Sequence, residues 1–336
     1  MSVEPMLAAT DDHGGNMRRM TLAIISLALM ADQALAQSHP GPEMFNEQDV
    51  VHGISISRPD CAKLESQETA VWVVVRAKGY CLRYYAYGLK PGREGNAVVA
   101  GWLHGDVVGG SHPKHAGHQQ GLGVSAMIAQ ERGLSERYKV PFIFLARPGA
   151  YGSAGYHPTM ASTPLEADLV AAQVAAITGR YGVRSWALGG HSGGGTLVAD
   201  LIARRKDVRC AVISSGAPAH SAYLEAWGAS GEIKAFGLNP IDQVRAITPS
   251  RTRVVVMGDP RDRNVLWPVQ QIYQHALATR GIDSTLIPLE RGLPDEFHSL
   301  VGLGEAATGL CAGGLSFPEI RARLEAMPSQ RPRISN

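Results

Sequence analysis

The sequence lacks a strong net charge, internal repeats and low-complexity tracts. Over 336 residues the formal net charge is only +2, and neither a repeat of fixed period nor a low-complexity tract occurs. A charge this small does not indicate a nucleic-acid partner. Hydrophobic residues make up 45% and charged residues 18%, which excludes a disordered or collagen-like chain. A single globular domain is therefore expected.

Long apolar runs are also scarce, and the longest lies near the N-terminus. Residues 17–36 begin with two arginines, continue with a short apolar run and end in Ala-Leu-Ala. This pattern predicts an export signal peptide cleaved after Ala36, with a buried N-terminal helix as the alternative. The segment 1–16 before it is polar, which is consistent with Met17 as the true start.

Cleavage would remove two basic and four acidic residues, so the net charge would rise from +2 to +4. No other apolar run approaches the roughly 18 residues of a membrane span. We therefore expect a secreted or periplasmic protein without stable membrane insertion. Residues 1–36 are the N-terminal extension and signal peptide, residues 37–68 an N-terminal arm, and residues 69–336 the folded domain.

Cysteine is sparse, and no C-x-x-C pair indicates a zinc site. An even number of cysteines in an exported chain favours disulfides, and four cysteines allow three connectivities. We expect Cys61 to pair with Cys81, which would tie an early hairpin. Cys210 would then pair with Cys311 and tie the start of a strand to the C-terminal helix.

Short apolar runs alternate with segments of helical period from residue 97 onward. Strands are expected at 97–103, 140–146, 185–188, 208–214, 252–257 and 284–289, and helices at 121–130, 165–181, 196–205, 269–278 and 300–326. This alternation predicts an α/β fold, with a mainly parallel sheet and helices on both faces. Two β-rich runs, 70–77 and 81–88, predict an antiparallel hairpin at one edge.

The strongest chemical motif is a G-x-S-x-G turn between an expected strand and helix. It places Ser192 between Gly190-His191 and Gly193-Gly194. A serine nucleophile needs a turn so tight that the flanking glycines cannot carry side chains, and the following helix directs its N-terminal amides at developing negative charge. A plain glycine-rich turn between a packed helix and strand is the alternative.

A serine hydroxyl needs a base, and the base needs a group that holds its tautomer. His298 follows the last expected strand and precedes the terminal helix, a place from which it could reach Ser192, with a surface-loop histidine as the alternative. Asp262 lies in the loop after the strand at 252–257, and Asp259 on the same loop is the alternative acid. The strand at 210–215 ends without an acid.

Acyl transfer also needs donors for the oxyanion. We assign these to the backbone amides of Gly193 and Asp106, although a carboxylate at Asp106 would repel the oxyanion unless it were turned away or paired. An ordinary turn is the alternative for this loop. His104 precedes it, and Arg147 and Tyr151 lie in a glycine-rich run after another strand, so all three are possible pocket residues.

One motif could bind a metal. His112, His115 and His118 stand at H-x-x-H-x-x-H spacing in a glycine-rich loop. No carboxylate or cysteine completes a ligand set there, and helical spacing is not evident. We therefore expect neither a metal nor another cofactor.

From about residue 69 to 326 the chain resembles the α/β hydrolases. The motifs in matching order are His104-Gly105, the Arg147-Pro148-Gly149 run, the Ser192 turn, the Asp262 loop and His298. More weakly, Asn239-Pro240-Ile241-Asp242, Asp262-x-x-Val265 and the helix end at 278–281 resemble the catalytic domain of prolyl-oligopeptidase-like hydrolases.

The resemblance implies a serine hydrolase acting on a small-molecule ester or a short peptide. The arm is too short to build the propeller that limits access in those peptidases, and the segment 218–251 is short for an elaborate lid. An open site favours an esterase. A small peptidase and a non-catalytic binding protein on the same fold are the alternatives.

Overall fold

A computed structural model of the chain describes residues 44–92, 95–107, 119, 121–229, 237–249, 251–294 and 296–328. Residues 40–336 belong to one compact unit. The predicted signal peptide at 17–36 and the three histidines at 112, 115 and 118 lie outside the described residues.

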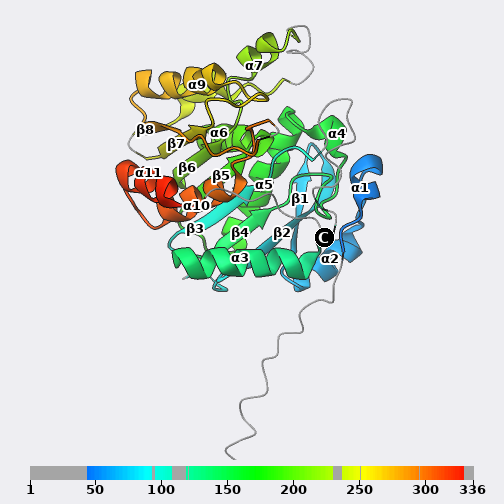
Figure 1. Ribbon diagram of the computed structural model, residues 1–336. Coiled ribbons are helices and arrows are strands. Elements are labelled where there is room, and N and C mark those ends of the chain that lie inside the picture. The colour runs from blue at the N-terminus through cyan, green and yellow to red at the C-terminus, as the bar shows by residue number, and fades with distance from the viewer. Residues whose placement is uncertain are drawn as a thin grey trace, which may run out of the picture. The chain divides into compact units, whose positions relative to one another are not determined.

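An eight-stranded sheet forms the centre of this unit, in the order β1-β2-β4-β3-β5-β6-β7-β8 (Figure 1). The strands are β1 (Ala70–Val75), β2 (Lys78–Tyr87), β3 (Val99–Leu103), β4 (Phe142–Leu145), β5 (Trp186–His191), β6 (Val208–Ser214), β7 (Arg253–Gly258) and β8 (Ser284–Pro288). Strand β2 is antiparallel to β1 and β4, and the other pairs are parallel. The predicted α/β architecture with an antiparallel edge hairpin is confirmed.

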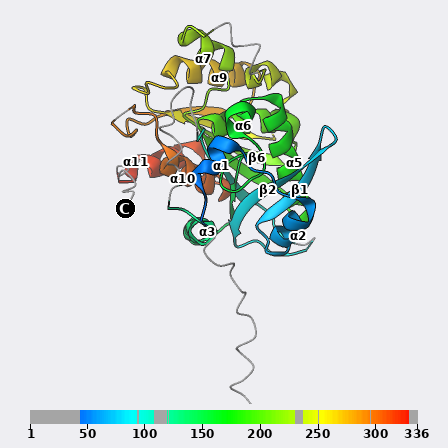
Figure 2. The ribbon, with the colours of Figure 1, turned by 90° about the vertical axis from the view of Figure 1, so that its right-hand side faces the viewer.

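Helices cover both faces of the sheet (Figures 1 and 2). The helices are α1 (Glu47–His52), α2 (Arg58–Ser66), α3 (Val124–Tyr138), α4 (His157–Met160), α5 (Pro164–Tyr181), α6 (Gly193–Arg204), α7 (His220–Ala226), the 3-10 helix η3 (Pro240–Ala246), α9 (Trp267–Thr279), α10 (Val301–Ala312) and α11 (Phe317–Ala326). One core lies between the sheet and α5, α6 and α9, and the other between the sheet and α3, α10 and α11.

Alternation along the strands supplies both cores. In β3, Trp102 points to the α10 side and Leu103 to the α6 side, and Phe144 and Leu145 alternate in the same way in β4. Successive side chains of a strand point to opposite faces, so a strand covered on both faces reads as a continuous apolar run. This is why these strands could be located from the sequence.

Two disulfides link helices to the sheet, with the pairing that the sequence analysis favoured. Cys61 on α2 is bonded to Cys81 on β2, and Cys210 on β6 is bonded to Cys311 on α10. Helices α1 and α2 lie in the segment 37–68, in which no regular element was expected. The bond at Cys61 fastens α2 to the hairpin.

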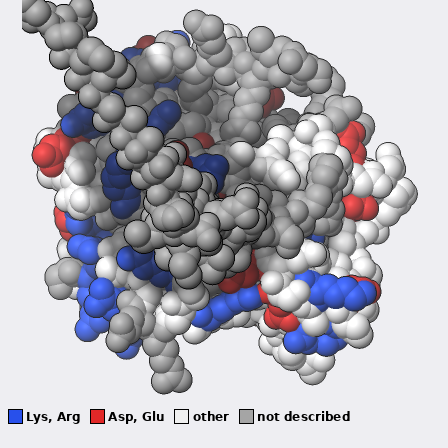
Figure 3. Space-filling view, turned by 90° about the horizontal axis from the view of Figure 1, so that it is seen from below, with Lys and Arg blue, Asp and Glu red and all other residues white. Residues whose placement is uncertain are grey.

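Charges of both signs mix on the surface. Where described side chains are visible in Figure 3, basic and acidic groups are interspersed. Ion pairs on the helices include Arg132 with Glu136 on α3 and Arg321 with Glu325 on α11. Across the described part of the chain, no helix combines the length and the apolar character needed to cross a membrane.

Parallel strands all finish at the same end of the sheet, which is called its carboxyl end here. The loop 104–107 follows β3, Ser192 follows β5, α7 follows β6, and the loop 259–265 follows β7. The segment that leads to His298 follows β8. The fold therefore gathers residues from five separate parts of the sequence at the carboxyl end of the sheet.

Candidate active site

Ser192 occupies the turn between β5 and α6 in a conformation that few non-glycine residues adopt. Its φ is 53° and its ψ is −123°. A Cβ on Gly190 would collide with the backbone of Gly194, and a Cβ on Gly194 would collide with the carbonyl oxygens of Leu103 and His104. Both glycines are thus required by close backbone approach, as the motif predicted, and a backbone strained in this way is typical of a functional site.

His298 and Asp262 are in direct contact. The Nδ1 atom of His298 lies 2.8 Å from Oδ2 of Asp262. An ionised carboxylate only accepts hydrogen bonds, so Nδ1 is the donor in this contact, and in the neutral ring the lone pair is then on Nε2. The other oxygen, Oδ1, accepts the backbone N–H groups of Asn264 at 2.8 Å and Val265 at 3.0 Å. The Asp262 carboxylate is therefore held by its own loop while it orients the imidazole.

Asp259, the alternative acid, is engaged elsewhere. It accepts hydrogen bonds from the guanidinium of Arg261 at 3.0 and 2.8 Å and from the backbone N–H of Gly292 at 2.9 Å. Burial raises the pKa of Asp259, but these hydrogen bonds lower it overall. Of the two carboxylates on this loop, the geometry joins only Asp262 to His298.

The imidazole of His298 lies next to the serine turn. Its ring centroid is 4.8 Å from that of His191, the residue before Ser192. Ser192 is partly exposed, whereas His191 and Gly193 on either side of it are buried. Among the hydrogen bonds of the described residues, none joins the Ser192 hydroxyl to His298. Catalytic hydrogen bonds are often long in a free enzyme and tighten in the substrate complex.

The loop after β3 lies against the start of α6. A Cβ on Gly105 would be 3.3 Å from the Cβ of Ser192, and a Cβ on Gly193 would collide with the Asp106 carboxylate. The two residues assigned as oxyanion donors, Gly193 and Asp106, are thus neighbours. The role of their amides stays a prediction.

The Asp106 carboxylate is paired, which is the condition set in the sequence analysis. Its Oδ1 atom lies 2.7 Å from Nη1 of Arg147. Burial raises the pKa of Asp106, but the charge of Arg147 and the hydrogen bond from its guanidinium hold that pKa well below its usual range. The carboxylate is therefore ionised and bound to a buried cation.

His104, at the start of this loop, contacts Arg147 and Tyr151 from the run after β4. All three are buried, and the His104 ring stacks on Phe144 at 5.5 Å and lies 4.7 Å from the Tyr151 ring. Tyr151 has a φ of 47°, and its backbone N–H donates to Gln119 at 2.8 Å. These contacts connect the loop to the run after β4, and the proposed place of the three residues in a pocket wall stays a prediction.

Helix α7 adds two residues that the sequence analysis missed, His220 and Tyr223, whose rings stack at 5.6 Å. Burial, followed by the charges of Asp106, Asp262 and Glu296, raises the pKa of Tyr223 to about 12. Its hydroxyl donates to Asn264 at 3.3 Å. A His-x-x-Tyr pair in the segment that follows the carboxyl end of β6 was the available signal.

Within the described ranges, no group of three or more His, Cys, Asp or Glu side chains could hold a metal ion. The H-x-x-H-x-x-H motif falls outside those ranges, so its interpretation stays as the sequence left it.

No protein-family model matches the chain, and no curated protein matches it in sequence. Solved structures do match. An esterase from Pyrococcus furiosus has a TM-score of 0.51 at 12% identity, over 77% of this chain and 93% of its own. A Pyrococcus horikoshii acylaminoacyl peptidase has a TM-score of 0.48 at 12% identity, over 70% of this chain but only 38% of its own.

An Agrobacterium tumefaciens protein of unknown function, assigned to the α/β hydrolases, has a TM-score of 0.46 at 16% identity, over 78% of this chain and 100% of its own. Identities this low speak for the fold alone. The strand order, the antiparallel edge hairpin and the superposition on the Pyrococcus furiosus esterase agree with one another. The chain has the α/β-hydrolase fold.

Proposed function

We propose that this protein is a serine hydrolase that cleaves carboxylic esters through an acyl-enzyme on Ser192. One observation carries the proposal: the imidazole of His298, held by Asp262 at 2.8 Å, lies beside the strained turn that presents Ser192. A nucleophile, a base and an orienting acid in this relation are the arrangement that acyl transfer requires.

In the proposed reaction, Oγ of Ser192 attacks the ester carbonyl while Nε2 of His298 takes the hydroxyl proton. The negative charge moves to the carbonyl oxygen, where the amides of Gly193 and Asp106 would stabilise it. The C–O bond then breaks, and the alcohol leaves with the proton from His298. Water then attacks the acyl-enzyme while His298 takes its proton. The bond to Oγ of Ser192 breaks, His298 returns the proton to Oγ, and the acid is released without a cofactor.

In the described residues, the segment between β6 and β7 contains only short helices, α7 and η3. Such a segment is short for an elaborate lid, and an open site favours an ester over an amide. The same three groups cleave amides as well. An exported small peptidase is therefore the alternative, and parallel assays on p-nitrophenyl esters and on aminoacyl or peptidyl anilides separate the two.

We also propose that the protein acts outside the cytoplasm, either secreted or in the periplasm. Both disulfides join cysteines that are buried, and such bonds persist in oxidising compartments. The proposal predicts a mature N-terminus at Gln37. Mass spectrometry of the exported protein measures it, and an uncleaved chain in the soluble cell fraction would contradict it.

The test of the enzymatic proposal is labelling by a fluorophosphonate probe together with ester hydrolysis. Wild-type protein should be labelled, and Ser192→Ala should abolish labelling without unfolding. Ser185→Ala is the matched control. Ser185 lies before β5, at the other end of this strand from Ser192, and its hydroxyl donates a hydrogen bond to the carbonyl of Ala97 at 2.7 Å. A folded wild type that is neither labelled nor active would leave a binding protein on this fold.

A further inference from the structure

Arg147 binds two separate parts of the structure with one guanidinium. Its side chain is fully buried. Nε and Nη2 donate to the two carboxylate oxygens of Glu166 at 2.8 and 3.0 Å, while Nη1 contacts Oδ1 of Asp106 at 2.7 Å and donates to the His104 carbonyl at 3.2 Å. One side of the guanidinium therefore faces α5, and the other faces the loop 104–107.

Glu166 supplies the fixed end of this arrangement. It lies in the first turn of α5, its side chain is fully buried, and Oε2 also accepts the backbone N–H of Ser162 at 2.8 Å. Two parallel bonds to a carboxylate fix the plane of a guanidinium as well as its position. The direction of the Nη1 atom of Arg147 is therefore set by groups that do not belong to the loop.

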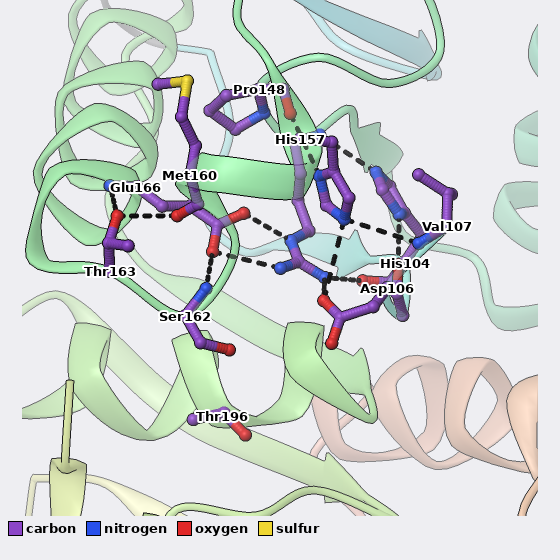
Figure 4. Close-up of polar contacts among 12 residues, drawn as sticks. His104, Asp106, Val107, Pro148, His157, Met160, Ser162, Thr163, Glu166 and Thr196 are labelled. Atoms are coloured by element: carbon purple, nitrogen blue, oxygen red, sulfur yellow. Dashed lines mark hydrogen bonds and ion pairs between the residues drawn. The ribbon is translucent and has the colours of Figure 1, made fainter. Parts of the chain in front are cut away.

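Three residues of the loop, His104, Asp106 and Val107, are bound to Arg147 or His157 (Figure 4). Besides the Asp106 contact, Nε2 of His104 accepts the backbone N–H of Arg147 at 3.1 Å, and Nε2 of His157 accepts the backbone N–H of Val107 at 3.4 Å. Burial and the charge of Arg147 lower the pKa of His104 well below its usual value, so its ring stays neutral and able to accept. The loop is thus held on both sides of Asp106.

The contact with Arg147 matters because the Asp106 carboxylate carries a negative charge close to the proposed oxyanion site. The carboxylate lies against the backbone of Gly193, and its side chain is 34% exposed. A free carboxylate there would repel the negative oxygen formed during acyl transfer. Bound to Nη1 of Arg147, the carboxylate is partly neutralised.

We propose that Arg147, fixed by Glu166, is a positioning residue for the oxyanion site: it holds the Asp106 carboxylate so that the amides of Asp106 and Gly193 stay in register with Ser192. The inference rests on the proposed function and goes beyond it, because it assigns a task to side chains that do not touch substrate. A displacement of about 1 Å in such a site can cost about a hundredfold in rate.

Asp106→Ala is the first test, because it removes the contact and leaves Arg147 paired with Glu166, so that no buried charge is stranded. We expect kcat for a p-nitrophenyl ester to fall about 10- to 100-fold with KM changed less than about threefold. Affinity for a trifluoromethyl ketone, which forms a tetrahedral adduct with serine, should fall in parallel. Asp106→Asn keeps an oxygen that Nη1 can bind and should restore most of kcat.

Asp168→Ala is the matched control. Asp168 is 30% exposed and pairs with Arg76 and Arg204 at 2.8 Å, so its loss should lower the melting temperature without lowering kcat. Asp106→Ser is the second variant if the alanine variant does not fold, with the same expected loss of kcat. Arg147→Lys, which keeps the charge but cannot bind both carboxylates in this geometry, should also lower kcat more than it changes KM.

Unchanged kcat and inhibitor affinity in folded Asp106→Ala would overturn the inference, as would an increase in kcat in both Asp106→Ala and Asp106→Asn. The second result would mean that the carboxylate opposes the reaction. Wild-type protein without hydrolase activity would instead overturn the proposed function, and the inference with it, before any variant is compared.

Discussion

Replacing Asp262 by Asn should disable the proposed base while leaving its surroundings almost unchanged. Oδ1 of Asp262 accepts the two backbone N–H groups of Asn264 and Val265, so the amide oxygen of an asparagine would take that place. Its NH₂ group would then face Nδ1 of His298, 2.8 Å from the oxygen it replaces. A donor opposite Nδ1 moves the ring proton to Nε2, and the lone pair needed to activate Ser192 is lost.

The equivalent exchange in a Ser-His-Asp protease lowers kcat by about 10⁴-fold, and a tenfold change in rate corresponds to about 1.4 kcal/mol. We therefore expect Asp262→Asn to lower kcat by about 10³- to 10⁴-fold, or about 4 to 5.5 kcal/mol of transition-state stabilisation. Steady-state hydrolysis of a p-nitrophenyl ester measures the loss, and thermal unfolding followed by circular dichroism shows whether the variant is folded.

Asp259→Asn is the matched control on the same loop. It weakens the contacts to Arg261 and Gly292, so stability should fall, but kcat should stay within about tenfold of wild type because His298 keeps its partner. The reasoning is refuted if Asp262→Asn retains wild-type kcat, or if Asp259→Asn proves to be the damaging exchange.

Three further predictions concern stability. Replacing Cys210 and Cys311 together by Ala should lower the free energy of unfolding in urea by about 4.7 kcal/mol, because the bond closes a loop with a sequence separation of 101. Ser192→Gly should have a free energy of unfolding about 1 kcal/mol or more above that of Ser192→Ala, since glycine adopts a φ of 53° without strain. Thermal unfolding of the two variants measures the difference. Burial, followed by the charge of Glu305, raises the pKa of Glu131. The folded state therefore binds this proton more tightly than the unfolded state, so stability should fall as the pH rises above the usual pKa of a glutamate, and denaturation of Glu131→Gln should show a smaller fall.

Strands were easier to predict than helix ends, and the reason lies in burial. β6 was expected at 208–214 and is found there, because five of its seven residues are buried and apolar. The helix expected at 121–130 continues to Tyr138 as α3, since its later buried positions are Glu131 and Ser135. Polar residues on the inner face of a helix conceal its period, so its second half did not appear in the pattern.

Short helices before the sheet were not predicted for a related reason. α1 and α2 each bury a single residue, Val50 and Cys61, and neither is long enough to show a helical period. Ser57 caps α2 through the Asp60 amide, and the bond from Cys61 to β2 adds a covalent attachment to a small apolar cluster. Contacts of this kind depend on the folded chain.

The residues of the proposed chemistry could be located because each lies in a local motif at the end of a strand. Their supports could not. Glu166 lies 19 positions from Arg147, and His157 lies 50 positions from Val107, and neither stands in a recognisable motif. These pairs form when separate loops and helices meet, so sequence spacing alone does not reveal them.

Asp106 shows how the two kinds of information combine. The sequence alone marked a carboxylate beside the oxyanion as unfavourable unless it is paired, and the structure supplies the pair through Arg147. Because Arg147 also neutralises Glu166, its loss would leave two carboxylates without their cation, one of them fully buried. Loss of Asp106 alone leaves the buried pair intact. The order of expected stability losses, Arg147→Ala far greater than Asp106→Ala, therefore follows from charge balance and does not depend on which substrate the protein cleaves.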